Sequence, residues 1–142
     1  MGFTAIWRGL AVAASLLTLV GCGGPSPEDV ATAYWDSPTI EKRLELVADD
    51  AVFTTAAGID YVGKDAIREL YTTGTPTTLR QERVGTPRII GNTVAFDELT
   101  YPKGLGPSGV PLDPNQAYHI EIALTIERGK ITRHVVACTK NC

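Results

Sequence analysis

The spacing of hydrophobic residues changes along the chain and predicts helices first and strands later. The segment Ser26-Pro27-Glu28-Asp29 offers a cap residue, a first-turn proline and two acids, which predicts a helix running to about Trp35. Ser37-Pro38 repeats this start signal, and the helical spacing of apolar residues predicts a second helix ending near residue 48. The sequence "KDAIRELY", residues 64–71, predicts a third helix.

Strand patterns occupy most of the remaining sequence. "AVFTT" (51–55) predicts a strand, and "AAGIDYVG" (56–63) predicts a turn into a short second strand. The later sequence predicts a strand at "TLRQERV" (78–84), a hairpin around Gly91-Asn92, and another hairpin around "ERG" (127–129). Helices followed by a curved antiparallel sheet make an α+β fold.

A long segment rich in glycine and proline separates the two predicted hairpins. It covers residues 102–116 and is too long for a simple connection between strands. Segments of this kind act as lids, binding loops or mobile stretches, so its role is left open among the three.

The turn of the last hairpin decides which side chains share a face of the sheet. A three-residue loop at Glu127-Arg128-Gly129 pairs Ile122 with His134 and turns Glu121 and Arg133 to the opposite face. A two-residue turn instead places Glu121 diagonal to His134 on a common face, because a one-residue slip exchanges the faces. We favour the first register, since it gathers on one face the residues Tyr118, Ile120, Ile122, Leu124, His134, Val136 and Cys138.

The N-terminal sequence has the pattern of an export signal. An apolar run over residues 9–20 follows Arg8 and is shorter than the ~20 residues that a spanning helix needs. Leu19-Val20-Gly21-Cys22 resembles the bacterial lipobox, which implies cleavage before Cys22 and attachment of acyl chains such as palmitate to it. The alternative is an ordinary signal peptide with a chance cysteine.

The lipobox resemblance predicts the organisation and location of the chain. Residues 1–21 would be a lipoprotein signal peptide, residues 22–27 the lipidated cysteine and a tether, and residues 28–142 one domain. One acyl chain binds a membrane only marginally, whereas a diacylated cysteine anchors stably. We therefore expect an exported protein, held by lipid on the outer face of the bacterial cell membrane or on its periplasmic side.

Charge and cysteine content limit which binding partners and which covalent links are expected. All 16 acidic residues but only 12 of the 13 basic ones follow Arg8, and no basic cluster stands out, which excludes nucleic acid as an expected partner. With Cys22 lipidated, Cys138 and Cys142 are left as a pair, which predicts a disulfide in an oxidising compartment; two free thiols are the alternative. His119 and His134 lack the spacing of a metal site with these cysteines, so no metal or cofactor is predicted.

The block "ELVADDAVFTTAAGIDYVGKDAIRELY" (45–71) and the later "GKI" (129–131) resemble the nuclear-transport-factor-2-like superfamily. That superfamily includes ketosteroid isomerases and polyketide-cyclase-like (SnoaL-like) domains. The resemblance covers about residues 28–138 and implies a cone-shaped, cystatin-like fold. In such a cone a strongly bent sheet wraps around helices and leaves an apolar pocket at the open end.

Catalytic positions of ketosteroid isomerases are not retained. The position of the basic aspartate is Thr55, whose hydroxyl cannot act as a general base near neutral pH. The oxyanion tyrosine falls on Ala31, with Tyr34 about one turn further on. The position of the second aspartate falls on Glu121 or Ile122.

His134 matches a histidine of polyketide-cyclase-like domains in the pattern "GKI-x-x-H". Those domains often carry an aspartate two residues later, where this chain has Val136. His134 is interpreted either as a pocket group that contacts ligand or as a histidine hydrogen-bonded within the wall. The predicted pocket residues are Tyr34, Thr55, Ile122 and His134.

Two functional hypotheses follow. In the first, the domain binds a small apolar ligand in the cone, or a protein partner at the membrane, and is not an enzyme. In the second, it is an isomerase- or cyclase-like enzyme with His134 as acid/base, assisted by Glu121 or Tyr34. A homodimer through the open sheet face is a further expectation. Asp49-Asp50 is interpreted as capping a helix end and starting a strand, and Asp97-Glu98 as marking a solvated edge.

Overall fold

The helices come first, as their start signals predict. The computed structural model describes residues 23–74, 80–101 and 114–142. Helix α1 (Pro27–Trp35) begins with a capping box, in which Ser26 Oγ accepts the Asp29 N–H and the Asp29 carboxylate accepts the Ser26 N–H. Helix α2 (Ile40–Glu45) is capped by Thr39, and α3 (Lys64–Glu69) continues into a π-helical turn, Leu70–Gly74.

The second helix ends three residues earlier than its hydrophobic spacing predicts. Val47 is the first residue of strand β1 (Val47–Thr54), where it pairs with Ile131. The Leu46 carbonyl accepts the Ile131 N–H at 2.8 Å. This pairing with a distant strand outweighs the local helical preference, which is weak in a segment of six residues.

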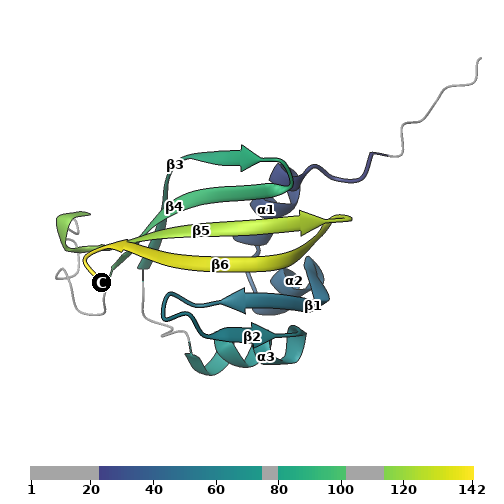
Figure 1. The fold of residues 1–142 in the computed structure, drawn as a ribbon, viewed down its shortest axis with the longest axis horizontal. Coiled ribbons are helices and arrows are strands. Elements are labelled where there is room, and N and C mark those ends of the chain that lie inside the picture. The colour runs from purple at the N-terminus through teal and green to yellow at the C-terminus, as the bar shows by residue number, and fades with distance from the viewer. Residues whose placement is uncertain (1–22, 75–79, 102–113) are drawn as a thin grey trace, which may run out of the picture.

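Six strands form one curved sheet in the order β2-β1-β6-β5-β4-β3, with the helices against it (Figure 1). The strands that follow β1 along the chain are β2 (Asp60–Val62), β3 (Arg80–Ile90), β4 (Thr93–Tyr101), β5 (Tyr118–Glu127) and β6 (Lys130–Lys140). All neighbouring strands are antiparallel except β1 and β6, which are parallel, so the sheet is mixed. The α+β, cystatin-like fold class is confirmed.

The last hairpin has a different turn from the predicted one but the predicted faces. Arg128 and Gly129 form a two-residue turn with φ of 52° and 73°, and Glu127 pairs with Lys130. Thr132 is then an extra residue, because Ile126 pairs with Ile131 while Thr125 pairs with Arg133. This bulge reverses the effect of the shorter turn on the faces.

His134 consequently pairs with Leu124, and Ile122 pairs with Val136. The predicted pairing of Ile122 with His134 is therefore wrong by two residues, but an even displacement leaves both on the inner face. Glu121 pairs with Ala137 and points to the outer face.

The core lies between the concave face of the sheet and the helices. Its largest fully buried apolar side chains are Phe53, Phe96, Ile67, Leu124 and Ile131. At the C-terminus the predicted disulfide joins Cys138 and Cys142, and the Asn141 side chain donates to the Ala117 carbonyl at 2.8 Å. The tail is thereby held against the start of β5.

Several sequence predictions concern residues beyond those described. The predicted signal peptide, Cys22 and residues 102–113 of the long segment lie outside them, while Pro114–Gln116 forms a short 3₁₀ helix. Among the helices that the structure describes, none has the length and apolar character to cross a membrane.

Candidate functional site

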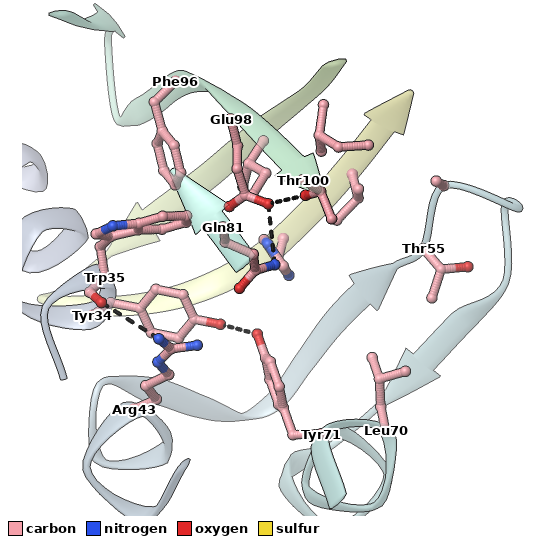
Figure 2. Close-up of a pocket in the computed structure, with 15 residues that line it drawn as sticks. Tyr34, Trp35, Arg43, Thr55, Leu70, Tyr71, Gln81, Phe96, Glu98 and Thr100 are labelled. Atoms are coloured by element: carbon pink, nitrogen blue, oxygen red, sulfur yellow. Dashed lines mark hydrogen bonds between the residues drawn. The ribbon is translucent and has the colours of Figure 1, made fainter. Parts of the chain in front are cut away.

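A cavity of about 370 Å³ opens between the concave sheet face and the helices (Figure 2). This volume is within the range of about 300–1,000 Å³ typical of small-molecule sites. The sheet contributes side chains from β3, β4, β5 and β6, and the opposite wall comes from α1, α2, the β1–β2 turn and the π-helical turn. The lining residues are Tyr34, Trp35, Arg43, Thr55, Ala56, Leu70, Tyr71, Gln81, Phe96, Glu98, Thr100, Ile120, Ile122, His134 and Val136.

Glu98 is the acidic group of the cavity. It is only 2% exposed, and its Oε1 accepts from Thr100 Oγ1 at 2.7 Å and from Gln81 Nε2 at 3.1 Å. Its Oε2 is buried and has no hydrogen-bond partner among the described residues. Burial raises the pKa of this carboxyl, and the hydrogen bonds from Thr100 and Gln81 oppose the rise only in part.

The interpretation of Asp97-Glu98 as a solvated edge is wrong for Glu98. Neighbouring strand residues face opposite sides, so Asp97 points outward, where Arg88 Nη1 donates to it at 2.7 Å, and Glu98 points into the cavity. The alternation of Val94, Phe96, Glu98 and Thr100 in β4 carried this information, because the first two residues mark the inner face. The inward direction of Glu98 is missed when Asp97 and Glu98 are treated together as one exposed acidic pair.

Two tyrosines form the second polar feature. The hydroxyls of Tyr34 and Tyr71 hydrogen-bond each other across the cavity, as Figure 2 shows. Burial raises the pKa of both phenols, that of Tyr34 to well above its ordinary value, so both are neutral near pH 7. One hydroxyl proton is used between the rings, which leaves the other free to donate to a ligand oxygen.

His134 is the third polar group, and it is 8% exposed. Its imidazole lies against the ring of Phe53, with centroids 4.4 Å apart, and 6.1 Å from that of Tyr34. Burial, together with the charge of Arg43, lowers the pKa of His134 from 6.5 to about 4, so the imidazole is neutral at pH 7. No hydrogen bond to this ring is present within the described residues.

The structure places the four predicted pocket residues, Tyr34, Thr55, Ile122 and His134, on the wall of this one cavity. Thr55 also stabilises the β1–β2 turn, because its Oγ1 accepts the Ile59 N–H at 3.2 Å.

The other acidic candidates lie away from the cavity. Glu121 lies on the outer face, where its carboxylate accepts Arg88 Nη2 at 2.6 Å, so it forms no pair with His134. Asp49 pairs with Lys64 at 2.8 Å on the surface. In residues 23–74, 80–101 and 114–142, no three His, Cys, Asp or Glu side chains gather as a metal site would require.

Sequence comparison gives no match to a protein-family model or to a curated protein. Three solved structures illustrate the likeness in fold. An uncharacterized cystatin-fold protein from Novosphingobium aromaticivorans has a TM-score of 0.61 at 18% identity, covering 80% of this chain and 98% of that chain. A proposed polyketide cyclase from Sinorhizobium meliloti has a TM-score of 0.60 at 19% identity, covering 76% and 93%.

A proposed ketosteroid isomerase from Kribbella flavida has a TM-score of 0.64 at 12% identity, and the match covers 82% of this chain and 79% of that chain. At such identities the likeness establishes the fold and leaves the activity to be argued from the site.

The imidazole of His134 provides a direct test of the cavity's electrostatics. The chain has two histidines, so His119→Gln leaves His134 as the source of all imidazole signals. In an NMR titration we expect these signals to move with a midpoint near pH 4, because burial lowers the pKa of His134. A midpoint near 6.5 would contradict a buried imidazole.

The same pKa difference sets a pH dependence of stability. The pKa of His134 is lower in the folded state than in the unfolded state. Its contribution to the free energy of unfolding is therefore fully present above pH 6.5 and is lost as the pH falls through about 4. At about 1.36 kcal/mol per pH unit, the loss in unfolding free energy is about 3 kcal/mol. In denaturant unfolding, the free energy of unfolding of His134→Gln should lack this loss between pH 6.5 and 4.

Proposed function

We propose that this chain, which has the nuclear-transport-factor-2-like form of the cystatin fold, binds a small and largely apolar organic molecule in the cavity of its cone. The observation that carries the proposal is Glu98 Oε2, a buried oxygen without a hydrogen-bond partner among the described residues. Buried polar atoms are nearly always satisfied, so an unpaired oxygen on a residue that lines a cavity is expected to meet a donor from a ligand.

The walls favour a flat apolar molecule. Trp35 and Phe96, whose rings meet edge to face with centroids 4.8 Å apart, form an aromatic side of the cavity, and Ile120, Ile122 and Val136 form an aliphatic floor. A ligand with a ring system and one or two polar atoms would bury its rings here. A hydroxyl or amide N–H of that ligand would donate to Glu98, and an oxygen would accept from the tyrosine pair.

Filling the cavity tests this proposal. Ile122 lines it and is largely buried, so Ile122→Trp should occupy the space of a ligand. With 2-naphthol as a probe in isothermal titration calorimetry, we expect Ile122→Trp to weaken binding at least roughly tenfold. The matched control is Ile89→Trp, because Ile89 is half exposed and lies outside the cavity. Equal affinity of both variants would contradict binding in the cone.

We further propose that the domain is anchored to the outer side of a bacterial membrane through lipid on Cys22. Support comes from the lipobox-like sequence and from the Cys138–Cys142 disulfide, since disulfides persist in oxidising compartments. An apolar ligand would then be available from the adjacent membrane.

Labelling in bacterial cells tests the anchor. The full chain should incorporate labelled palmitate and sediment with membranes, and Cys22→Ser should lose the label and the membrane association. Cys142→Ser is the control that removes a cysteine without touching the anchor. Membrane-bound, labelled Cys22→Ser protein would show that another residue carries the lipid.

Acid/base catalysis is a second candidate function, favoured by the free Oε2 of Glu98. The raised pKa of this carboxyl suits a general base, and the neutral tyrosine pair suits a donor that stabilises an oxyanion. Glu98 would take a proton from carbon next to a ketone, while a tyrosine hydroxyl donates to the ketone oxygen. Glu98, rather than the predicted His134 or Glu121, would be the base.

Hydrogen exchange detects this chemistry without knowledge of the natural substrate. With 2-tetralone in D₂O, an enzyme of this kind should speed the exchange of the protons next to the ketone, followed by NMR. Glu98→Gln should remove the acceleration because an amide cannot take up the proton, and Glu121→Gln should retain it. Exchange at the uncatalysed rate with the native protein would argue against catalysis of this type.

A further inference from the structure

Arg43 of helix α2 presents a positive charge to the cavity without a carboxylate partner. No described acidic side chain lies within 4.0 Å of its guanidinium, whereas Arg68 and Arg88 each pair with two acids on the surface. The Arg43 guanidinium donates a long hydrogen bond, 3.4 Å, to the carbonyl of Trp35, and it also interacts with the Tyr71 hydroxyl, where it opposes the rise in pKa that burial causes. A guanidinium has five N–H donors, so these two contacts leave donors for a ligand.

Aromatic rings hold this guanidinium in place. Its central carbon lies 5.7 Å from the ring centroid of Tyr34 and 6.0 Å from that of Tyr71. Contacts with ring faces stabilise a cation modestly and leave the edge of the guanidinium free to meet an anion. Figure 2 shows the guanidinium beside the ring of Tyr34, with a dashed line from one nitrogen to the backbone oxygen of Trp35.

A second cavity begins at the same place. It has a volume of about 450 Å³ and is lined by Ser37, Pro38, Thr39, Ile40, Arg43 and Tyr71. Arg43 and Tyr71 line both cavities, so the guanidinium stands at their junction. Thr39 Oγ1 accepts the Lys42 N–H at 3.3 Å, which leaves its own proton to donate.

The first cavity supplies one acidic group, Glu98, but it forms no ion pair with Arg43. Burial raises the pKa of this carboxyl, and the charge of Arg43 opposes the rise. The Glu98 carboxylate is beyond ion-pair distance from Arg43 and is bound by Gln81 and Thr100. The other titratable groups that line the cavity beside Arg43 are Tyr34, Tyr71 and His134, none of which carries a negative charge near neutral pH. A partly buried cation without a counter-ion favours a ligand that brings one.

We propose that Arg43 binds the anionic group of an amphipathic organic acid, whose apolar body occupies the first cavity and whose carboxylate lies at the junction with the second. This inference rests on the proposed function, because the apolar body needs the cone. It adds the charge of the ligand and the residue that selects it.

A pair of isosteric probes isolates that charge. 2-Naphthoate and 2-naphthamide share their rings and nearly their shape, and differ by one negative charge. Dissociation constants of both are measured by calorimetry near neutral pH for the native full chain, Arg43→Gln and Ile122→Trp. The matched control is Arg83→Gln, because Arg83 also lies over an aromatic ring, 5.9 Å from that of Trp35, but does not line either cavity.

The native protein should bind the naphthoate roughly tenfold more tightly than the amide, as expected for charge-assisted hydrogen bonds. Arg43→Gln should remove that preference while changing the affinity for the amide less than about twofold. Arg83→Gln should keep the preference. If Arg43→Gln does not fold, Arg43→Lys should keep much of the preference, and added salt should weaken the naphthoate alone.

Two other outcomes overturn different claims. Equal affinities for the two probes in the native protein, or an equal loss of both in Arg43→Gln, would refute the anion site and leave binding in the cone intact. No binding of either probe, or binding that Ile122→Trp does not weaken, would refute the proposed function and this inference with it.

Discussion

A single extra residue in β6 determines which side chains reach the cavity. Thr132 is skipped in the pairing register with β5. With the two-residue turn at Arg128-Gly129, it restores the alternation that puts His134 and Val136 on the concave face. The parallel pairing of β6 with β1 also shifts between Val47 and Val52, beside this point. Without the bulge, every residue of β6 beyond it would face the other way, and the outer ion pairs of Glu121 would lie beside different neighbours.

The cavity combines two unpaired features that a purely structural core would avoid. Glu98 has one buried oxygen without a donor among the described residues. Arg43 has no carboxylate within ion-pair distance among them, although both residues line the same cavity. A direct ion pair between them would have satisfied both groups and filled the space with side chains. Their separation keeps a polar contact available at each end of an apolar chamber, an arrangement suited to orienting a bound molecule.

The sequence predicted the fold class because cap residues and hydrophobic period are local signals. Thr55 lies in the resembling block 45–71, and His134 follows the later GKI of residues 129–131. Both line the cavity, together with Tyr34 of the first helix and Ile122 of the last hairpin. The sequence misplaced the end of α2 because Val47 pairs with a strand more than 80 residues away in the sequence. Glu98 was missed although its strand alternates clearly. Arg43 was missed because its role depends on a second cavity that only the packing of α2 against the π-helical turn creates.

The π-helical turn at Leu70–Gly74 has a consequence for how this site could change. A π-turn holds one residue more than an α-turn, so the direction of Tyr71 depends on the number of residues before it as well as on their identity. Tyr71 is the second residue of this turn, so removal of one residue before it would rotate its ring by roughly 100° about the helix axis, away from Tyr34. Tyr71 lines both cavities, so the number of residues before it sets how the two cavities are separated.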